Sequence, residues 1–307
     1  MFEKLSLNRK EKSAASKRIG FFIKLLLTAL MLWFVFRRLD PTAIKSSVES
    51  LPIVLIIDII LISVLRHYIQ YLNWFCALKM NHGVKFKRKE VMASYLVAQP
   101  LRFAIPGGSA SFAKIFYLEN TSVFASFIAT STERLFLTWA TWSFAAIAYL
   151  CLFTTHSLIL RLGLVVLLVF IPLWTAFILA AIPKTKKYLS GYLIQAPKMM
   201  LLQIANTSLM YLQYYLLLNR FVRIDAIETW LGMSLTNISN SIPITISGLG
   251  LREGFAMHFL ADYGFNAEQA VAVTLSLFVF HDVIFALIGA GVLIASPAKQ
   301  KSSEKIE

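Results

Sequence analysis

The sequence predicts an all-α polytopic membrane protein, on three observations. Apolar residues make up 58% of the 307 residues and charged residues only 15%, against about 25% charged in an ordinary soluble domain. Several apolar runs reach the roughly 20 residues that cross about 30 Å of hydrocarbon. Lys and Arg gather in the hydrophilic gaps between these runs, as the positive-inside rule expects, so the net charge of +14 does not indicate a nucleic-acid partner.

Full spans are expected in six apolar runs, at 19–38, 52–78, 133–153, 158–182, 199–220 and 268–295. A basic head (1–18) precedes them and a short tail (296–307) follows. Two further regions, 91–131 and 229–263, are interrupted by Pro and Gly, at Pro106, Gly107, Gly108, Pro243, Gly248 and Gly250. The helical pieces beside each break are too short to cross at 1.5 Å per residue. Each region is therefore expected to be a re-entrant hairpin or a pair of short helices, which would make eight helices.

The distribution of Lys and Arg predicts the topology. Eighteen lie in the head, the gaps 79–90 and 183–198, and the tail, whereas six lie in the alternate gaps. Both termini are therefore expected on the cytoplasmic side of the inner membrane. The two broken regions must then enter from opposite faces, so that 19–153 and 154–295 form an inverted repeat. Paired broken segments are typical of a transporter's midplane site, although Pro and Gly are common in membrane helices generally.

Charged residues inside apolar segments are candidates for a binding site, because each costs at least about 2.5–3.5 kcal/mol to insert. Asp58, Arg66, Gln70 and Asn73 are expected to form one polar stripe. The candidate substrate-binding residues are Arg66, Arg102, Lys114, Glu133, Arg134, Arg252, Glu253, His281 and Asp282. Lys114 and Arg252 follow a Gly break near the start of a half-helix, which favours an anionic headgroup. The structural alternative is that opposite charges neutralise each other and hold helices together.

Neither a metal nor a cofactor is expected. His258 and His281 are 23 residues apart, without an HExxH, CxxC or carboxylate cluster around them. The stretch Thr-Ile-Ser-Gly at 245–248, with His281 as a base, loosely resembles the serine motif of intramembrane proteases. Thr245 replaces the first Gly of that motif, and an intramembrane enzyme remains only an alternative.

Three motifs resemble the membrane region of the lysylphosphatidylglycerol synthase/flippase family, over about residues 50–295. They are Pro-Gly-Gly at 106–108, Lys-Ile-Phe-Tyr-Leu at 114–118 and Gly-Leu-Gly-Leu-Arg-Glu-Gly at 248–254. The resemblance implies a helical membrane domain that handles lipids, with functional candidates in Arg252, Glu253 and the preceding Gly-Leu-Gly. Lys114 stands where the family usually has Arg, and Ser-Ala-Ser at 109–111 departs from the family's glycine and acidic residue. The family's soluble aminoacyl-transferring domain is not recognisable, so lysyl transfer is not expected.

These observations predict a flippase-like transporter rather than an enzyme. The expected substrate is an anionic lipid or a polyprenyl-linked glycolipid, moved between leaflets for envelope lipid biogenesis. The first alternative is a non-transporting accessory subunit of a membrane lipid or glycolipid synthase, which would make that synthase a partner. The second is the intramembrane enzyme.

Overall fold

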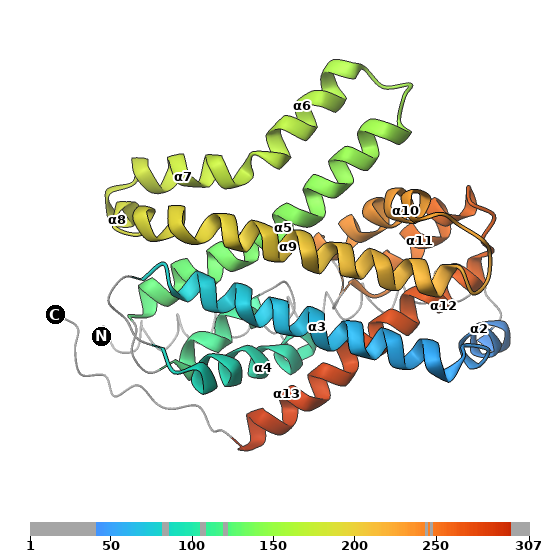
Figure 1. The fold of residues 1–307 in the computed structure, drawn as a ribbon, viewed down its shortest axis with the longest axis horizontal. Coiled ribbons are helices and arrows are strands. Elements are labelled where there is room, and N and C mark those ends of the chain that lie inside the picture. The colour runs from blue at the N-terminus through green and yellow to red at the C-terminus, as the bar shows by residue number, and fades with distance from the viewer. Residues whose placement is uncertain are drawn as a thin grey trace, which may run out of the picture.

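The computed structural model describes residues 41–81, 86–104, 109–118, 122–242, 245 and 248–295, and this part of the chain is helical without strands (Figure 1). The all-α prediction is confirmed. The predicted span 19–38, the head, the tail, and the breaks at 106–108 and Pro243 lie outside the described residues.

The first half of the described chain contains α2 (Pro41–Glu49), α3 (Ile53–Leu78), α4 (Arg88–Ala104), η1 (Ser109–Tyr117) and α5 (Val123–Leu152). The second half contains α6 (Leu158–Val169), α7 (Ile171–Ala181), α8 (Pro183–Lys186), α9 (Leu189–Leu218), α10 (Ala226–Ile238), η2 (Ser239–Ser241), α11 (Leu251–Ala261), α12 (Ala267–Leu277), the π-helical turn η4 (Phe278–Val283) and α13 (Ile284–Ala295).

Among the described residues, three helical stretches can cross a membrane by length and composition: α3, α5 and the continuous stretch from α12 to α13. The helices α6 and α7 add a fourth if they form one span, bent by 56°. The bend lies where Pro172, which has no N–H, opens α7. The six full spans and the inverted repeat stay predictions.

Two helices begin about ten residues earlier than expected. The start of α5 is set by Ser122, whose hydroxyl accepts a hydrogen bond from the Ala125 N–H. The start of α9 lies inside the predicted cytoplasmic gap 183–198, because Tyr192 and Met199 pack into the core there. That gap is therefore largely helical.

The bundle is centred on α3 and α9, which run side by side (Figure 1). On one side α4 packs against α13, and on the other α10 packs against α5. Glycines allow close approach at two contacts: a Cβ at Gly289 would lie 2.2 Å from the Leu96 carbonyl oxygen, and one at Gly191 would lie 2.3 Å from that of Met80. Small residues at helix contacts are typical of membrane bundles.

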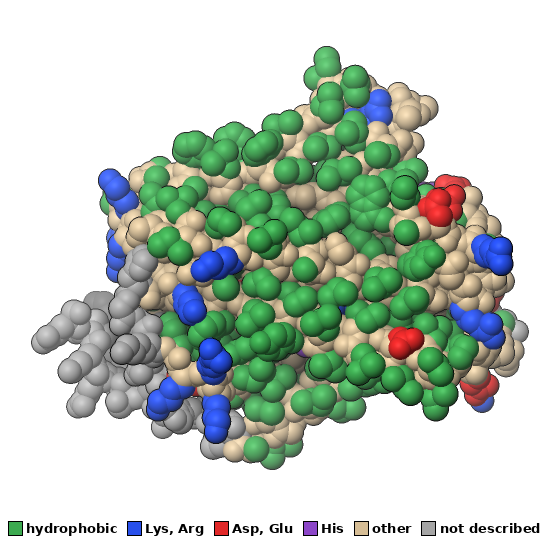
Figure 2. Space-filling model, viewed as in Figure 1, with side chains coloured by type: hydrophobic (Ala, Val, Ile, Leu, Met, Phe, Trp, Pro, Cys, Tyr) green, Lys and Arg blue, Asp and Glu red, His purple; other side chains and the backbone are tan. Residues whose placement is uncertain are grey.

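The outer surface is apolar across its middle. Figure 2 shows hydrophobic side chains covering the centre of one face, with most of its Lys, Arg and acidic side chains toward the two ends. Exposed apolar side chains include Ile53, Leu61, Phe177 and Leu201. This arrangement places the apolar band against lipid and the charged ends in the two interfaces.

Candidate functional site

A polar cavity of about 400 Å³ lies inside this apolar bundle. Its walls come from α3, α4, η1, α5, α9, α10, η2, the start of α11, the end of α12 and η4. Eight of the nine predicted charged or histidine side chains line it: Arg66, Arg102, Lys114, Glu133, Arg134, Arg252, His281 and Asp282. The ninth, Glu253, forms an ion pair with Arg252. The structure therefore brings together residues that are up to 216 positions apart in the sequence.

Arg66 enters the cavity from α3 and is 5% exposed. Its Nη1 donates to Gln213 Oε1 at 2.6 Å, and its Nε donates to Asn206 Oδ1 at 3.4 Å. Gln213 is fixed in turn, because its Nε2 donates to the Ile59 carbonyl and to Ser63 Oγ, both at 2.8 Å. Since these partners are neutral, they orient the guanidinium without cancelling its charge.

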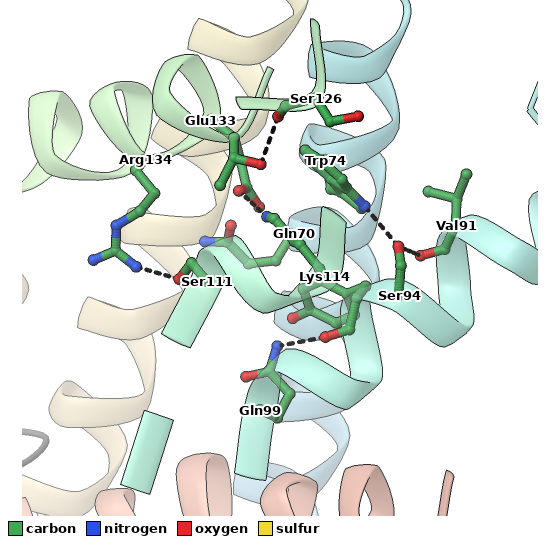
Figure 3. Close-up of polar contacts among 12 residues, drawn as sticks. Gln70, Trp74, Val91, Ser94, Gln99, Ser111, Lys114, Ser126, Glu133 and Arg134 are labelled. Carbon is green, nitrogen blue, oxygen red and sulfur yellow. Dashed lines mark hydrogen bonds and ion pairs between the residues drawn. The ribbon is translucent and has the colours of Figure 1, made fainter. Parts of the chain in front are cut away.

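Lys114, from η1, is 2% exposed and donates to the carboxylate of Glu133 on α5 (Figure 3). Its ammonium also lies 3.8 Å from the ring centroid of Trp74, a cation–π contact. Trp74 is held by a 2.9 Å hydrogen bond to Ser94 Oγ. Lys114 is therefore a buried, paired cation.

Arg134 does not pair with its neighbour Glu133 in the sequence. Its Nη1 donates to Ser111 Oγ, as Figure 3 shows. Consecutive residues on a helix point in different directions, and the carboxylate of Glu133 pairs with Lys114 instead. Like Arg66, Arg134 forms no ion pair with a carboxylate among the described residues.

Arg252 and Glu253 form a compact unit at the start of α11. The Nε and Nη2 of Arg252 donate to Glu253 Oε1 at 3.1 and 2.8 Å, and the Gly250 N–H donates to Glu253 Oε2 at 2.6 Å. Gly250 has φ +82°, which glycine adopts without steric cost. Lys114 and Arg252 thus each have a carboxylate partner, so an anionic headgroup would meet them as ion pairs rather than as free cations. Their contact with a headgroup stays a prediction.

His281 and Asp282 lie in the π-helical turn η4. Asp282 Oδ1 lies 3.7 Å from Arg102 Nη1 on α4, in a partly exposed ion pair. The ring of His281 stacks on that of His67, with centroids 4.4 Å apart. Single π-turns inside α-helices occur frequently at functional sites, and this one turns both side chains toward the cavity.

The model of a known family covers nearly all of this structure. The family is described as the lysylphosphatidylglycerol synthase transmembrane region, and its model matches residues 21–289. The chain belongs to this family. No curated protein gives a significant match to the chain. Membership in the lysylphosphatidylglycerol synthase transmembrane family identifies a multi-pass membrane protein with a role connected to membrane lipids, and it confirms the resemblance found in the sequence.

Several cavity residues of this family member were not predicted from the sequence. They are His67, Tyr95, Gln99, Ser111, Asn206, Thr207, Tyr214, Asn237 and Asn240. A signal was present in α9, where Gln203, Asn206 and Gln213 recur on one buried face of an otherwise apolar helix. These amides lower the apolar character of α9, which is 30 residues long but is not among the candidate spans.

The predicted polar stripe on α3 is only partly correct. Arg66 and Gln70 line the cavity, and Gln70 exchanges hydrogen bonds of 3.2–3.3 Å with Gln203. Asp58 is exposed beside the exposed Val54 and Leu61. Eight residues turn a helix about 80° past two full turns, which moves Asp58 off the face of Arg66.

Residues on both sides of both breaks line this one cavity. Arg102 precedes the first break and Ser111 follows it, while Asn240 precedes the second and Gly248 follows it. Within the described part of the chain, no three His, Cys, Asp or Glu side chains are grouped so that they could hold a metal ion. The cavity is lined by five cations and two carboxylates, Glu133 and Asp282, together with neutral hydrogen-bonding groups.

Proposed function

We propose that this protein is a flippase-like transporter that moves an anionic lipid, a phospholipid or a polyprenyl-linked glycolipid, between leaflets. The observation that carries the proposal is the excess of cations in the buried cavity. Arg66, Arg102, Lys114, Arg134 and Arg252 face it with Glu133 and Asp282, and Glu253 lies directly behind. Five cations against three carboxylates leave a positive interior, which an anionic headgroup would balance.

Arg66 and Arg134 are the two cavity cations without a carboxylate partner in the described part of the chain, and they are the best candidates for direct headgroup contact. Guanidinium groups present several N–H donors in a planar fork that matches phosphate oxygens. Arg66 already has two of its nitrogens oriented by Gln213 and Asn206. A headgroup that enters the cavity would therefore meet a preorganised donor.

The packing of the two halves supports access from both membrane faces. The pairing of α4 with α13 corresponds to that of α10 with α5 when the halves are exchanged, and α3 and α9 then exchange with each other. This pattern is expected of an inverted repeat. We propose alternating access around the shared cavity, in the inner membrane, with both termini cytoplasmic.

We further propose that the protein is a carrier rather than an enzyme. A non-transporting accessory subunit of a lipid synthase is the second candidate, and one observation favours it. Helix α6 has no buried residue and leans away from the bundle (Figure 1). Its apolar surface is available to lipid or to a synthase partner.

The test is lipid movement in vesicles that contain the purified protein. Fluorescent phosphatidylglycerol and phosphatidylcholine are compared by the fraction that a membrane-impermeant reductant bleaches over time. We expect phosphatidylglycerol to move faster, and Arg134→Gln and Arg66→Gln to slow it at least tenfold. Lys45→Gln, in an exposed ion pair with Glu49, is the control. Equal rates for both lipids would contradict selection of an anionic headgroup, and no protein-dependent movement would favour the accessory subunit.

A further inference from the structure

Two stacked imidazole rings form part of the cavity wall. His67 on α3 and His281 on η4 have ring centroids 4.4 Å apart and planes inclined by 23°. The ring of Phe285 stacks against His67, at 3.7 Å. Both histidines line the cavity, and His67 is 5% exposed. Histidine exchanges protons near neutral pH, and ionisable groups at membrane depth mark ion and proton pathways.

The hydrogen bonds of His67 define its protonation state. Its Nε2 lies 3.0 Å from the backbone carbonyl oxygen of His281, which only accepts, so Nε2 carries a hydrogen. Its Nδ1 lies 2.7 Å from the Tyr95 hydroxyl, which donates to it in the neutral ring. His67 is therefore held in one neutral tautomer.

His281 is held differently. Its Nδ1 is buried and has no hydrogen-bond partner among the described residues. The ring is thus fixed by stacking and by the π-turn backbone rather than by a hydrogen bond at this nitrogen. A proton added to the pair has an unoccupied nitrogen on His281, whereas on His67 it would have to reverse the Tyr95 hydrogen bond.

The groups around the pair carry a net positive charge. The titratable and charged groups that face it from the surrounding elements are Arg66 on α3, Tyr95 and Arg102 on α4, Asp282 on η4 and Arg252 on α11. Asp282 and Glu253 balance part of this positive charge, but Arg66 forms no ion pair with any carboxylate that the structure describes. An anion beside Arg66 would offset this charge and so favour a proton on the pair.

We propose that the His281–His67 pair takes up one proton when an anionic headgroup binds, so that lipid and proton cross the membrane together. This inference rests on the proposed function. Binding linkage is reciprocal, so protonation also tightens headgroup binding. Two charged rings 4.4 Å apart would repel each other strongly, which limits the pair to one proton. The complex of a singly charged headgroup with one proton moves no net charge against the membrane potential.

Proton uptake on binding can be measured directly. The full chain in detergent and weak buffer is titrated with dihexanoyl phosphatidylglycerol, while a dye reports pH. This phosphodiester does not titrate between pH 6 and 8, so uptake reports the protein. We expect uptake approaching one proton near neutral pH, none with dihexanoyl phosphatidylcholine, and affinity that rises as pH falls, by up to about tenfold per pH unit.

Three substitutions distinguish a proton-binding role of the histidine pair from a purely structural role. His281→Gln should abolish proton uptake and flatten the pH dependence of binding. His258→Gln, an exposed histidine on α11, should keep both. Tyr95→Phe removes the hydroxyl bonded to His67 and should displace the pH profile, which a purely structural loss would not do.

The outcomes distinguish this inference from the function on which it rests. Phosphatidylglycerol that binds or is flipped without proton uptake, or His281→Gln with an unchanged pH profile, would overturn the inference and leave the transporter intact. Absence of both binding and flipping at every pH would overturn the proposed function, and the inference with it.

Discussion

The two broken regions each contribute a buried ion pair to the cavity, but they build it differently. In the first region Lys114 belongs to η1 and Glu133 to α5, so the pair joins two elements. In the second region Arg252 and Glu253 are neighbours in the first turn of α11, and Glu253 also accepts from the Gly250 N–H. The first pair separates if η1 moves, whereas the second moves as one unit with its helix.

This difference suggests that the two regions have different roles in transport. We expect the first region to open and close by breaking a contact between elements. We expect the second to act as a preformed unit whose geometry is set within one helix start. Matched substitutions in the two regions either separate them in this way or show that they are equivalent.

The largest expected effect is the loss of Glu253. Glu253→Leu leaves the guanidinium of Arg252, which is 4% exposed, without its carboxylate and removes the acceptor of the Gly250 N–H. We expect a loss of about 3–5 kcal/mol in the free energy of unfolding, measured by thermal unfolding in detergent. Adding Arg252→Met should recover only part of this loss, because the Gly250 N–H stays without an acceptor.

The corresponding double substitution in the first region should recover more of the lost stability. Lys114→Met alone leaves Glu133 buried and unpaired, and it should cost a similar amount. Lys114→Met combined with Glu133→Leu should return stability to within about 1 kcal/mol of the wild type, because an apolar pair replaces a buried ion pair at little cost. Equal recovery in both regions would show that the two pairs are equivalent.

The next effect concerns backbone conformation at the second break. Gly250 and Gly264 both have positive φ, +82° and +83°, but Gly264 lies in the turn after α11, with nothing within 4 Å of an added Cβ. Gly250→Val and Gly264→Val should each cost about 1–3 kcal/mol of local strain. Only Gly250→Val should stop lipid movement, because it displaces Arg252 and Glu253.

The sequence also predicts that Gly108→Val, outside the described residues, stops movement. If Gly250→Val is inactive and Gly108→Val is fully active at normal expression, the first break is a packing element. The gating role assigned above to the first region would then be wrong.

The sequence predicted which charged residues meet, but not how they pair. The insertion cost of charge pointed to Arg66, Lys114 and Arg252, because that cost depends only on residue type and position in an apolar run. Pairing depends on side-chain direction and on contacts between distant elements, so the partners Ser111 of Arg134 and Gln213 of Arg66 were not predictable. The π-turn at His281 and Asp282 has no recognisable sequence signature.

The ends of the spans could also be predicted only in part from the sequence. The stretches 52–78 and 268–295 were predicted closely, since apolar character and helix coincide there. The start of α9 was missed because Lys184, Lys186, Lys187 and Lys198 suggested a loop. Tyr192, which lies between these lysines, and Met199, which follows the last of them, are buried. Charged residues indicate the membrane interface, but they do not end a helix. The helix continues through the interface where one of its faces packs against another element.

The smallest expected effect on stability is that of replacing Arg102. This substitution distinguishes charged residues that stabilise the fold from charged residues that bind the headgroup. The Nη1 of Arg102 lies 3.7 Å from Asp282, but the two side chains are 45% and 21% exposed, so water screens the pair. Arg102→Gln should therefore change the free energy of unfolding by less than about 1 kcal/mol, as should Lys45→Gln in an equally long exposed pair.

The two variants should differ in transport, because only Arg102 lines the cavity. We expect Arg102→Gln to slow phosphatidylglycerol movement several-fold, and the gap to the wild type to narrow at high salt as ions screen the charge. If Arg102→Gln and Lys45→Gln transport alike, the positive charge that attracts the headgroup lies deeper, at Arg66 and Arg134.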